Sequence, residues 1–117
     1  MQLVLRDTQT AYKWGEGGVG WPLVDTDCLL VIEEDLAPGC NENRHHYKKA
    51  TQCFYLFEGT ALMKIDDRNV ILAQGVALHI QPGTCHAIAN ESSNEIQFLV
   101  ISGPSTRSDR HKIVVKK

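Results

Sequence analysis

The sequence predicts an all-β domain, a small sandwich or barrel, and three observations carry that prediction. Short apolar runs rich in β-branched and aromatic residues recur along the chain, and Gly, Pro, Asn and Asp separate them. No window keeps a helical period over several turns. Short strands at this density of turns are typical of small sandwiches and barrels. Because 117 residues suit one core, we expect a single domain over residues 1–117.

Eight strands are predicted in order along the chain. They cover residues 21–25, 28–34, 52–57, 61–65, 69–73, 76–81, 86–89 and 95–102. Turn-forming residues fill the gaps between them. The stretch "CLLVIEEDL" also permits a helix, but its β-branched pair and the following Pro38-Gly39 favour a strand.

Two of these strands, "CFYLF" and "QFLVIS", are apolar on both faces. In a two-layer fold one face fills the core, and the other needs a cover if it is not to stand in water. A second copy of the chain would provide that cover, so we expect a homodimer. The alternative is a terminal segment that folds back over the same face.

Charge and composition exclude several classes of partner. The formal net charge is −2, and the basic clusters are only Lys48-Lys49 and Lys116-Lys117, which does not favour a nucleic-acid partner. The start lacks the features of a signal peptide, and no apolar run is long enough for a membrane span. Four cysteines without a CxxC pair indicate reduced thiols. We therefore expect a soluble cytoplasmic protein.

Glycines, histidines and prolines form two blocks at fixed spacing. The first block, 39–59, and the second, 75–90, resemble the two motifs of the cupin superfamily, G-x5-H-x-H-x(3,4)-E-x6-G and G-x5-P-x-G-x2-H-x3-N. The positions in register are Gly39, His45, Gln52, Gly59, Gly75, Gly83, His86 and Asn90.

A narrower resemblance covers nearly the whole chain. The segments "RHHYKKATQCFYLFEG" and "FLVISGPSTRSDR", with the aromatic opening "YKWGEGGVGWPLV", are similar to small single-domain RmlC-like cupins of the cupin-2 type. The resemblance implies a small jelly-roll barrel, also called a double-stranded β-helix. It identifies a fold better than a reaction, because cupins include oxygenases, isomerases, storage proteins and sugar sensors.

The resemblance also implies a divalent transition metal (Zn, Ni, Fe or Mn) held by His45, Tyr47, Gln52 and His86. Alternate residues of a strand point to the same face, so positions 45 and 47 share the inward side. Nitrogen and oxygen donors from several strands can then converge and leave open positions for a substrate.

The chain departs from the motif at two ligand positions, where Tyr47 replaces a histidine and Gln52 a glutamate. Three interpretations follow. Tyr47 points inward and joins the site; or a bulge turns His46 inward instead; or the metal site is lost and a polar pocket remains. The two blocks also offer no obvious carboxylate base.

Three functions fit these features. The first is a metal-dependent cupin enzyme of dioxygenase type that acts on a small polar or aromatic metabolite. The second is a metal-free sugar ketoisomerase, because His45, Lys48 and Gln52 resemble the string H-x-H-K-x3-Q. The third is a module that binds a small molecule without chemistry.

For three other polar residues we expect structural roles rather than a part in the site. We expect His79 to be a core or rim histidine, Asn90 to stabilise the turn after its strand, and His111 to lie in a solvated tail.

Overall fold

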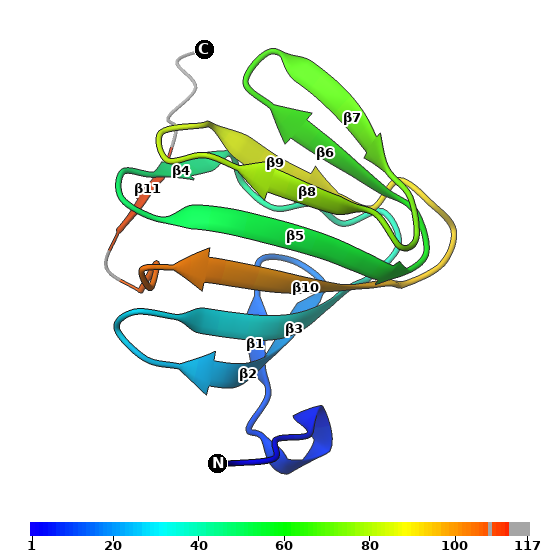
Figure 1. Cartoon of the computed structure of the whole chain (residues 1–117). Coiled ribbons are helices and arrows are strands. Elements are labelled where there is room, and N and C mark those ends of the chain that lie inside the picture. Colours follow the sequence, from blue (N-terminus) through cyan, green and yellow to red (C-terminus); the bar gives the residue numbers. More distant parts are fainter. Residues whose placement is uncertain (108, 113–117) are drawn as a thin grey trace.

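The computed structural model describes residues 1–107 and 109–112, with the side chains of residues 1–107 and 109. The described residues form eleven strands and one short 3-10 helix (Figure 1). These elements are η1 Arg6–Thr8, β1 Tyr12–Trp14, β2 Gly18–Asp25, β3 Leu30–Leu36, β4 His45–Tyr47, β5 Thr51–Glu58, β6 Ala61–Ile65, β7 Arg68–Leu72, β8 Ala77–Ile80, β9 His86–Ala89, β10 Ile96–Gly103 and β11 Arg110–Lys112.

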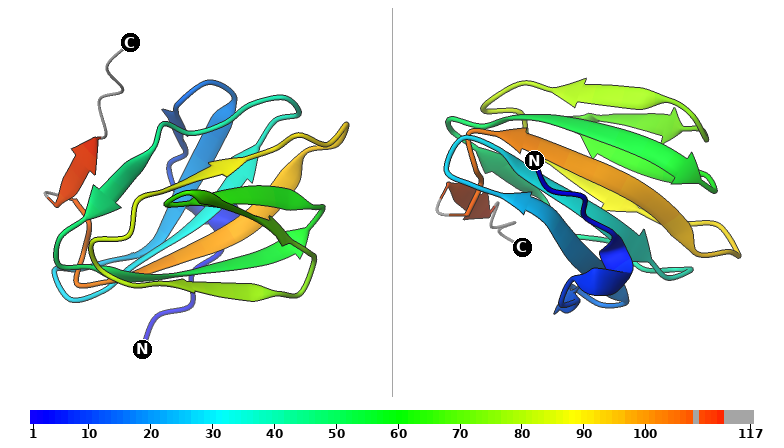
Figure 2. Two further views of the ribbon diagram at one scale, coloured as in Figure 1. Left: turned by 90° about the horizontal axis from the view of Figure 1, so that it is seen from above. Right: turned by 60° about the horizontal axis from the view of Figure 1, so that its bottom comes forward.

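The strands lie in two antiparallel sheets that face each other (Figure 2). One sheet has the order β1-β2-β3-β10-β5-β8, and the other has the order β11-β4-β9-β6-β7. The all-β prediction is confirmed, and the layered arrangement fits a jelly roll. The predicted barrel is met only in part, because no strand ladder within the described chain joins one sheet to the other.

The core fills the space between the two sheets. Strand β10 shows how the sequence produces it, since buried and half-buried residues alternate along its eight positions. Leu36, Leu56, Met63 and Phe98 are all fully buried there. Burial of side chains of this size stabilises the fold by roughly 1.5–3 kcal/mol each.

All eight predicted strands are present, and those at 61–65 and 86–89 have the predicted bounds. The helical alternative for 28–36 is wrong, because this stretch contains β3. Three strands were not predicted, namely β1, β4 and β11. Each has three residues, which is too short for an alternating pattern to be recognised.

The N-terminal segment packs on the outer face of the six-stranded sheet. Arg6 donates hydrogen bonds to the carboxylates of Glu33 and Asp35, and its guanidinium stacks 3.6 Å above the ring of Trp21. The hydrogen bond to Asp35 raises the pKa of Arg6, so the guanidinium stays charged. A terminal segment therefore covers one part of this face, as one of the two alternatives predicted.

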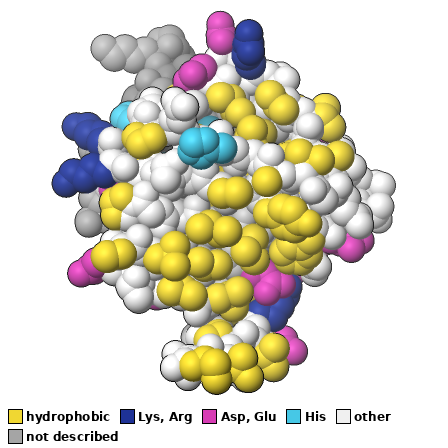
Figure 3. All heavy atoms as spheres, in the orientation of Figure 1, with side chains coloured by type: hydrophobic (Ala, Val, Ile, Leu, Met, Phe, Trp, Pro, Cys, Tyr) yellow, Lys and Arg dark blue, Asp and Glu magenta, His cyan; other side chains and the backbone are white. Residues whose placement is uncertain are grey.

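The rest of that face stays accessible and apolar. Val31 lies beside Ile101, and Leu99 lies beside Tyr55, on adjacent strands. Figure 3 shows a broad hydrophobic patch on this side of the molecule, with the N-terminal segment below it.

Among the described residues, none of the helices has the length and apolar character to cross a bilayer.

Candidate metal centre

Strands β4 and β9 bring two histidines together at their point of contact. His45 and His86 are directly opposite each other in this antiparallel pair. Their ring centroids lie 4.4 Å apart, and both residues are buried, with 2% and 1% of their surface exposed. Two imidazoles that come from separate blocks of the sequence thus meet between the sheets.

Backbone carbonyls fix how each ring is protonated. His45 Nδ1 lies 2.8 Å from the carbonyl oxygen of Asn43, and His86 Nδ1 lies 3.0 Å from that of Thr84. A carbonyl only accepts hydrogen bonds, so each Nδ1 carries the proton and donates it. Each Nε2 is then the basic nitrogen of its ring. Metal-binding histidines commonly have this arrangement, in which a hydrogen bond at one nitrogen orients the other toward the ion.

The turn before β9 sets the position of His86. Gly83 has a φ of 83°, a conformation that glycine adopts at little cost. Its N–H donates to the carbonyl of Tyr47 at 2.7 Å, which ties the turn to β4. Pro82 and Gly83 therefore form the turn that presents His86.

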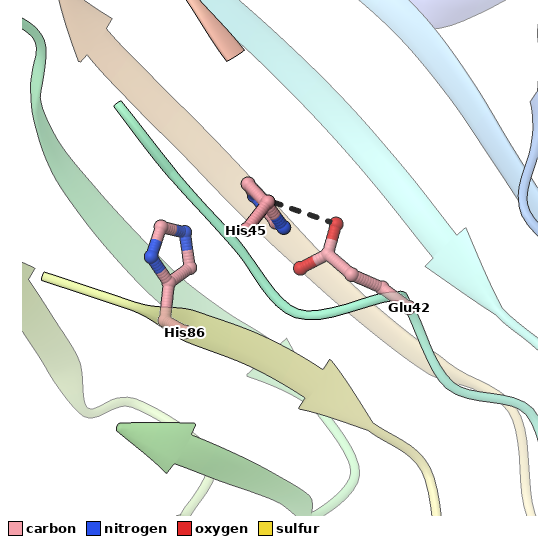
Figure 4. Close-up of side chains that lie close together, drawn as sticks. All are labelled: Glu42, His45 and His86. Atoms are coloured by element: carbon pink, nitrogen blue, oxygen red, sulfur yellow. Dashed lines mark ion pairs between the residues drawn. The ribbon is translucent and has the colours of Figure 1, made fainter. Parts of the chain in front are cut away.

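A carboxylate completes the cluster. Figure 4 shows Glu42, from the segment that leads into β4, next to His45 and His86. One ligand atom from each of the three residues lies within 4.8 Å of the others. Glu42 Oε2 is 4.0 Å from His45 Nε2, while Oε1 accepts a hydrogen bond from the backbone N–H of Ile88 at 3.3 Å. The side chain is therefore held from both sides.

Glu42 was not among the site residues predicted from the sequence. The expectation that the two blocks lack a carboxylate base is wrong, because Glu42 stands within the first block, three residues before His45. An acidic residue so close to a predicted ligand was the available signal. The direction of its side chain could not be predicted, because a loop has no alternation. The pairing of Asn41 with Ala89 and the hydrogen bond from Glu42 N–H to the carbonyl of Ile88 turn this loop toward β9.

Tyr47 points inward, as the first of the three interpretations states. It is buried, and its ring centroid lies 5.1 Å from that of His45 and 6.0 Å from that of His86. The proposed bulge is absent from the described residues of β4, which pairs with β11 in unbroken register. His46 therefore takes the opposite face of the strand and does not replace Tyr47.

Gln52 is also buried beside the site, with 4% of its surface exposed. Its Nε2 donates to Ser102 Oγ at 3.0 Å. Its Oε1 is buried and has no hydrogen-bond partner among the described residues. An unsatisfied buried acceptor costs about 1–3 kcal/mol, which a bound ligand or cation can offset. The donor set of imidazoles, carboxylate and amide oxygen thus fits a divalent first-row metal.

A cavity of about 220 Å³ adjoins these residues. Its polar lining includes Glu42, His45, Tyr47, Gln52 and Ser102, and the remaining lining residues are Tyr12, Trp14, Leu30, Ile32, Glu34, Phe54, Ile88, Phe98, Val100, Thr106 and Arg107. Most of these other residues are aromatic or aliphatic. Glu34, Thr106 and Arg107 add further polar groups, so the candidate centre adjoins a partly open cavity with both polar and apolar walls.

Tyr12 lines the same cavity with a neutral phenol. Burial, assisted by the negative charge of Glu34, raises the pKa of Tyr12 well above its usual range. The hydroxyl therefore stays protonated at physiological pH and can donate a hydrogen bond.

Two of the other polar predictions are confirmed. Asn90 donates to the carbonyl oxygens of Leu36 and Asn94 and accepts from the N–H of Ser92, so it stabilises the turn after β9. His79 is exposed and lies 2.7 Å from Thr51 Oγ1, as expected of a rim histidine. His111 does not lie in a tail, because its backbone is part of β11 and pairs with His46. Its side chain lies outside the described residues, so its solvation stays a prediction.

Asp109 holds the segment between β4 and β5 in place. The carboxylate of Asp109 accepts hydrogen bonds from the backbone N–H groups of Lys48, Lys49 and Ala50. These hydrogen bonds anchor the segment that leads directly to Gln52.

The four cysteines, Cys28, Cys40, Cys53 and Cys85, are free thiols.

Comparisons with known proteins agree with this fold. Among solved structures, the polyketide cyclase RemF from Streptomyces resistomycificus is 19% identical, with a TM-score of 0.86 over 100% of this chain and 88% of that chain. A predicted oxalate decarboxylase from Thermotoga maritima is 17% identical, with a TM-score of 0.80 over 89% of this chain and 100% of that one. A sugar phosphate isomerase of the cupin superfamily from Silicibacter pomeroyi is 17% identical, with a TM-score of 0.79 over 89% and 76%.

At these identities the structural matches show a common fold and leave the reaction open. No curated protein sequence matches this chain significantly. The family model of the Cupin domain matches residues 32–102, which span both sequence blocks and all the histidines of the candidate centre. This chain therefore belongs to the cupin family.

Proposed function

We propose that this cupin is a metal-dependent enzyme that acts on a small molecule held in the 220 Å³ cavity. The observation that carries the proposal is the convergence of Glu42, His45 and His86, whose ligand atoms lie within 4.8 Å of one another. In this proposal the three residues hold a divalent transition metal (Fe, Mn, Ni or Zn), and Gln52 Oε1 provides a further oxygen donor.

A dioxygenase-like reaction is the first candidate. Two histidines and one carboxylate form the ligand set of many non-haem Fe(II) oxygenases, which leaves positions open for substrate and oxygen. A ferrous ion held there would supply oxygen activation. The carbonyl partners of His45 and His86 would keep both Nε2 atoms basic, so that both could bind the ion.

Tyr47 would lie beside the metal, as a ligand or as a hydrogen-bond donor to the substrate. A phenol has a reference pKa of about 10 and is a poor ligand until it ionises. Its buried ring next to His45 and His86 nevertheless supports a role in the site, as a hydrogen-bond donor toward the substrate. The predicted ligand role of Tyr47 stays a proposal.

A redox-neutral reaction at the same centre is the second candidate. Tyr12 favours it, because its hydroxyl lies in the cavity wall and can donate a hydrogen bond that polarises a carbonyl group of the substrate during ring closure or isomerisation. The metal-free ketoisomerase has less support, since the Lys48 side chain is exposed and does not line the cavity. A module that only binds its ligand is the third possibility, and absence of turnover would identify it.

Elemental analysis of protein purified without chelator tests the metal centre. The H45A/H86A double variant is compared with His46→Ala, which removes a histidine from the opposite face of the same strand. We expect about one transition metal per chain in the wild type and in His46→Ala, and none in the double variant. Folded wild-type protein that stays metal-free after incubation with Fe, Mn, Ni and Zn would overturn the proposal.

Oxygen consumption separates the two enzymatic candidates. Metal-loaded protein that consumes oxygen in the presence of an aromatic metabolite, and more slowly in Glu42→Gln, supports the dioxygenase. Turnover at an equal rate under nitrogen supports the redox-neutral reaction.

The homodimer is also a proposal. It is supported by the accessible apolar side chains on the outer face of the six-stranded sheet, among them Val31, Tyr55, Leu99 and Ile101. Arg6 and its partners cover only the part of this face near Trp21. A cytoplasmic location stays a prediction from the sequence.

A further inference from the structure

One wall of the cavity consists of two aromatic rings laid against two glycines. In the β1–β2 pair, Tyr12 is opposite Gly20, and Trp14 is opposite Gly18. A Cβ atom at Gly20 would lie 2.6 Å from Tyr12 Cζ, and one at Gly18 would lie 2.4 Å from Trp14 Cε2. Real side chains do not approach this closely. The two glycines therefore allow both rings to lie flat on strand β2.

The rings lie on the inner side of the sheet. Gly18 and Gly20 are buried, and both Tyr12 and Trp14 line the cavity. Trp14 contacts Phe98 edge to face at a centroid distance of 6.3 Å, and Phe98 stacks on Phe54 at 6.0 Å. Aromatic surfaces therefore bound the space from β1, β5 and β10. Flat walls of this kind favour a flat ligand, because stacked and edge-to-face contacts add to the free energy of burial.

Trp14 also offers one unsatisfied polar atom. Its indole Nε1 is buried and has no hydrogen-bond partner among the described residues. An indole N–H can only donate. A ligand that places an acceptor oxygen near Nε1 would satisfy it and recover the free energy lost by burying an unpaired donor.

From these features we infer that the cavity binds a planar aromatic molecule of one or two rings that presents an oxygen acceptor to Trp14 Nε1. The inference rests on the proposed function, because it names the substrate class of the cavity beside the proposed metal centre. At about 220 Å³ the cavity is smaller than the roughly 300–1,000 Å³ typical of sites for drug-sized ligands. A molecule of one or two rings suits this volume.

The aromatic part of the wall favours a rigid flat ring. A flat ring stacks on Trp14, Phe54 and Phe98, whereas the hydroxyls of a sugar find few hydrogen-bond partners on that part of the wall. A flexible chain loses more conformational freedom on binding than a rigid ring of the same size. The ligand class is therefore set by the shape and chemistry of the wall that Tyr12 and Trp14 form.

Equilibrium dialysis with 2-naphthol tests the inference on the full-length protein as purified. The two comparison ligands are 2-decalol, which keeps the hydroxyl and loses planarity, and 2-methylnaphthalene, which keeps planarity and loses the oxygen. We expect 2-naphthol to bind at least tenfold more tightly than 2-decalol. Equal affinity for the planar and the saturated compound, or tighter binding of fructose 6-phosphate, would overturn the inference.

Two variants assign the contact to Trp14. Trp14→Phe keeps an aromatic ring and removes the N–H. It should therefore reduce the affinity for 2-naphthol about fivefold more than the affinity for 2-methylnaphthalene, as expected for one lost hydrogen bond. Trp21→Phe makes the same exchange on the outer face of the sheet and should change neither affinity. Equal losses for both ligands in Trp14→Phe would show that the indole acts only as a wall, and the acceptor contact would be wrong.

Gly20→Ala tests the shape of the wall. The added Cβ clashes mainly with the outer ring atoms of Tyr12, which can swing into the cavity, so we expect a folded protein with 2-naphthol affinity reduced about tenfold. Gly18→Ala is less suitable, because its Cβ would also meet the backbone oxygen of Trp14 at 2.6 Å. Unchanged affinity in folded Gly20→Ala would contradict the flat aromatic wall.

The metal and the ligand class are tested separately. Metal content and 2-naphthol affinity are measured on the same samples, before and after chelator treatment. Metal without preference for 2-naphthol would overturn the inference and leave the proposed function standing. Preference for 2-naphthol in protein that never binds metal would support the ligand class and overturn the metal-dependent function.

Discussion

The rings of His45 and His86 lie 4.4 Å apart because the two residues are directly opposite each other where β4 meets β9. This contact is one of several that join the two sequence blocks, together with the β5–β8 ladder and the pairing of Asn41 with Ala89. The fold and the candidate metal centre therefore depend on the same strand pairing, and the site forms only when the five-stranded sheet does.

Glu42→Gln tests the carboxylate of the centre. The amide keeps the size of the side chain and can still accept the hydrogen bond from Ile88, but it loses the negative charge that attracts a cation. We expect metal affinity to fall at least tenfold, the lower limit of losses seen when groups around a metal are changed. Competition with a chromogenic chelator measures this loss.

Glu91→Gln is the matched control, since Glu91 is exposed on the loop after β9. Its affinity for metal should equal that of the wild type. Equal affinity in Glu42→Gln as well would remove Glu42 from the centre and leave the histidines with other partners.

Gln52→Glu restores the carboxylate that the cupin motif has at this position. We expect this variant to bind the metal more tightly than the wild type, because the added negative charge attracts the cation. Without metal, no cation offsets the cost of burying this charge, so the variant should melt at a lower temperature than the wild type. Thermal unfolding with and without metal measures both effects, and a variant that is less stable under both conditions would place Gln52 outside the centre.

Leu99→Asp tests the proposed dimer. Leu99 lies on the apolar outer face of the six-stranded sheet, next to Tyr55. A buried charge in a dimer interface is costly, so the variant should be monomeric while the wild type is dimeric in light scattering after size exclusion. Ile71→Asp places the same charge on exposed β7 of the other sheet and should leave the dimer intact. A wild type that is already monomeric at high concentration would contradict the proposal.

Alternation along the strands made much of this molecule predictable. The inward facing of His45 and Tyr47 follows from their separation by one residue, and the position of His86 follows from the turn at Pro82-Gly83. Glu42 was not predictable, because it lies in a loop whose facing depends on contacts with a distant strand.

The aromatic wall escaped prediction for a related reason. Which glycine lies opposite Trp14 is set by the register of β1 on β2, and strands this short carry no pattern from which register can be read. The sequence therefore predicts which residues share a face more readily than which side chains meet across strands.

The buried phenol of Tyr12 predicts a dependence of stability on alkaline pH. Burial, followed by the charge of Glu34, raises the pKa of Tyr12 in the folded protein, and nearby Arg107 opposes this only in part. The unfolded chain releases the phenol proton near pH 10, while the folded chain holds it. The contribution of Tyr12 to the free energy of unfolding is thus fully present below about pH 10, and it falls above this pH by up to about 1.4 kcal/mol per pH unit.

Tyr12→Phe has no proton to lose at this position, so its free energy of unfolding should decline less steeply than that of the wild type. Urea unfolding between pH 9 and 11, compared with Tyr55→Phe at the exposed tyrosine, measures the difference. Parallel declines in wild type and Tyr12→Phe would mean that the Tyr12 phenol ionises as readily in the folded protein as in the unfolded chain.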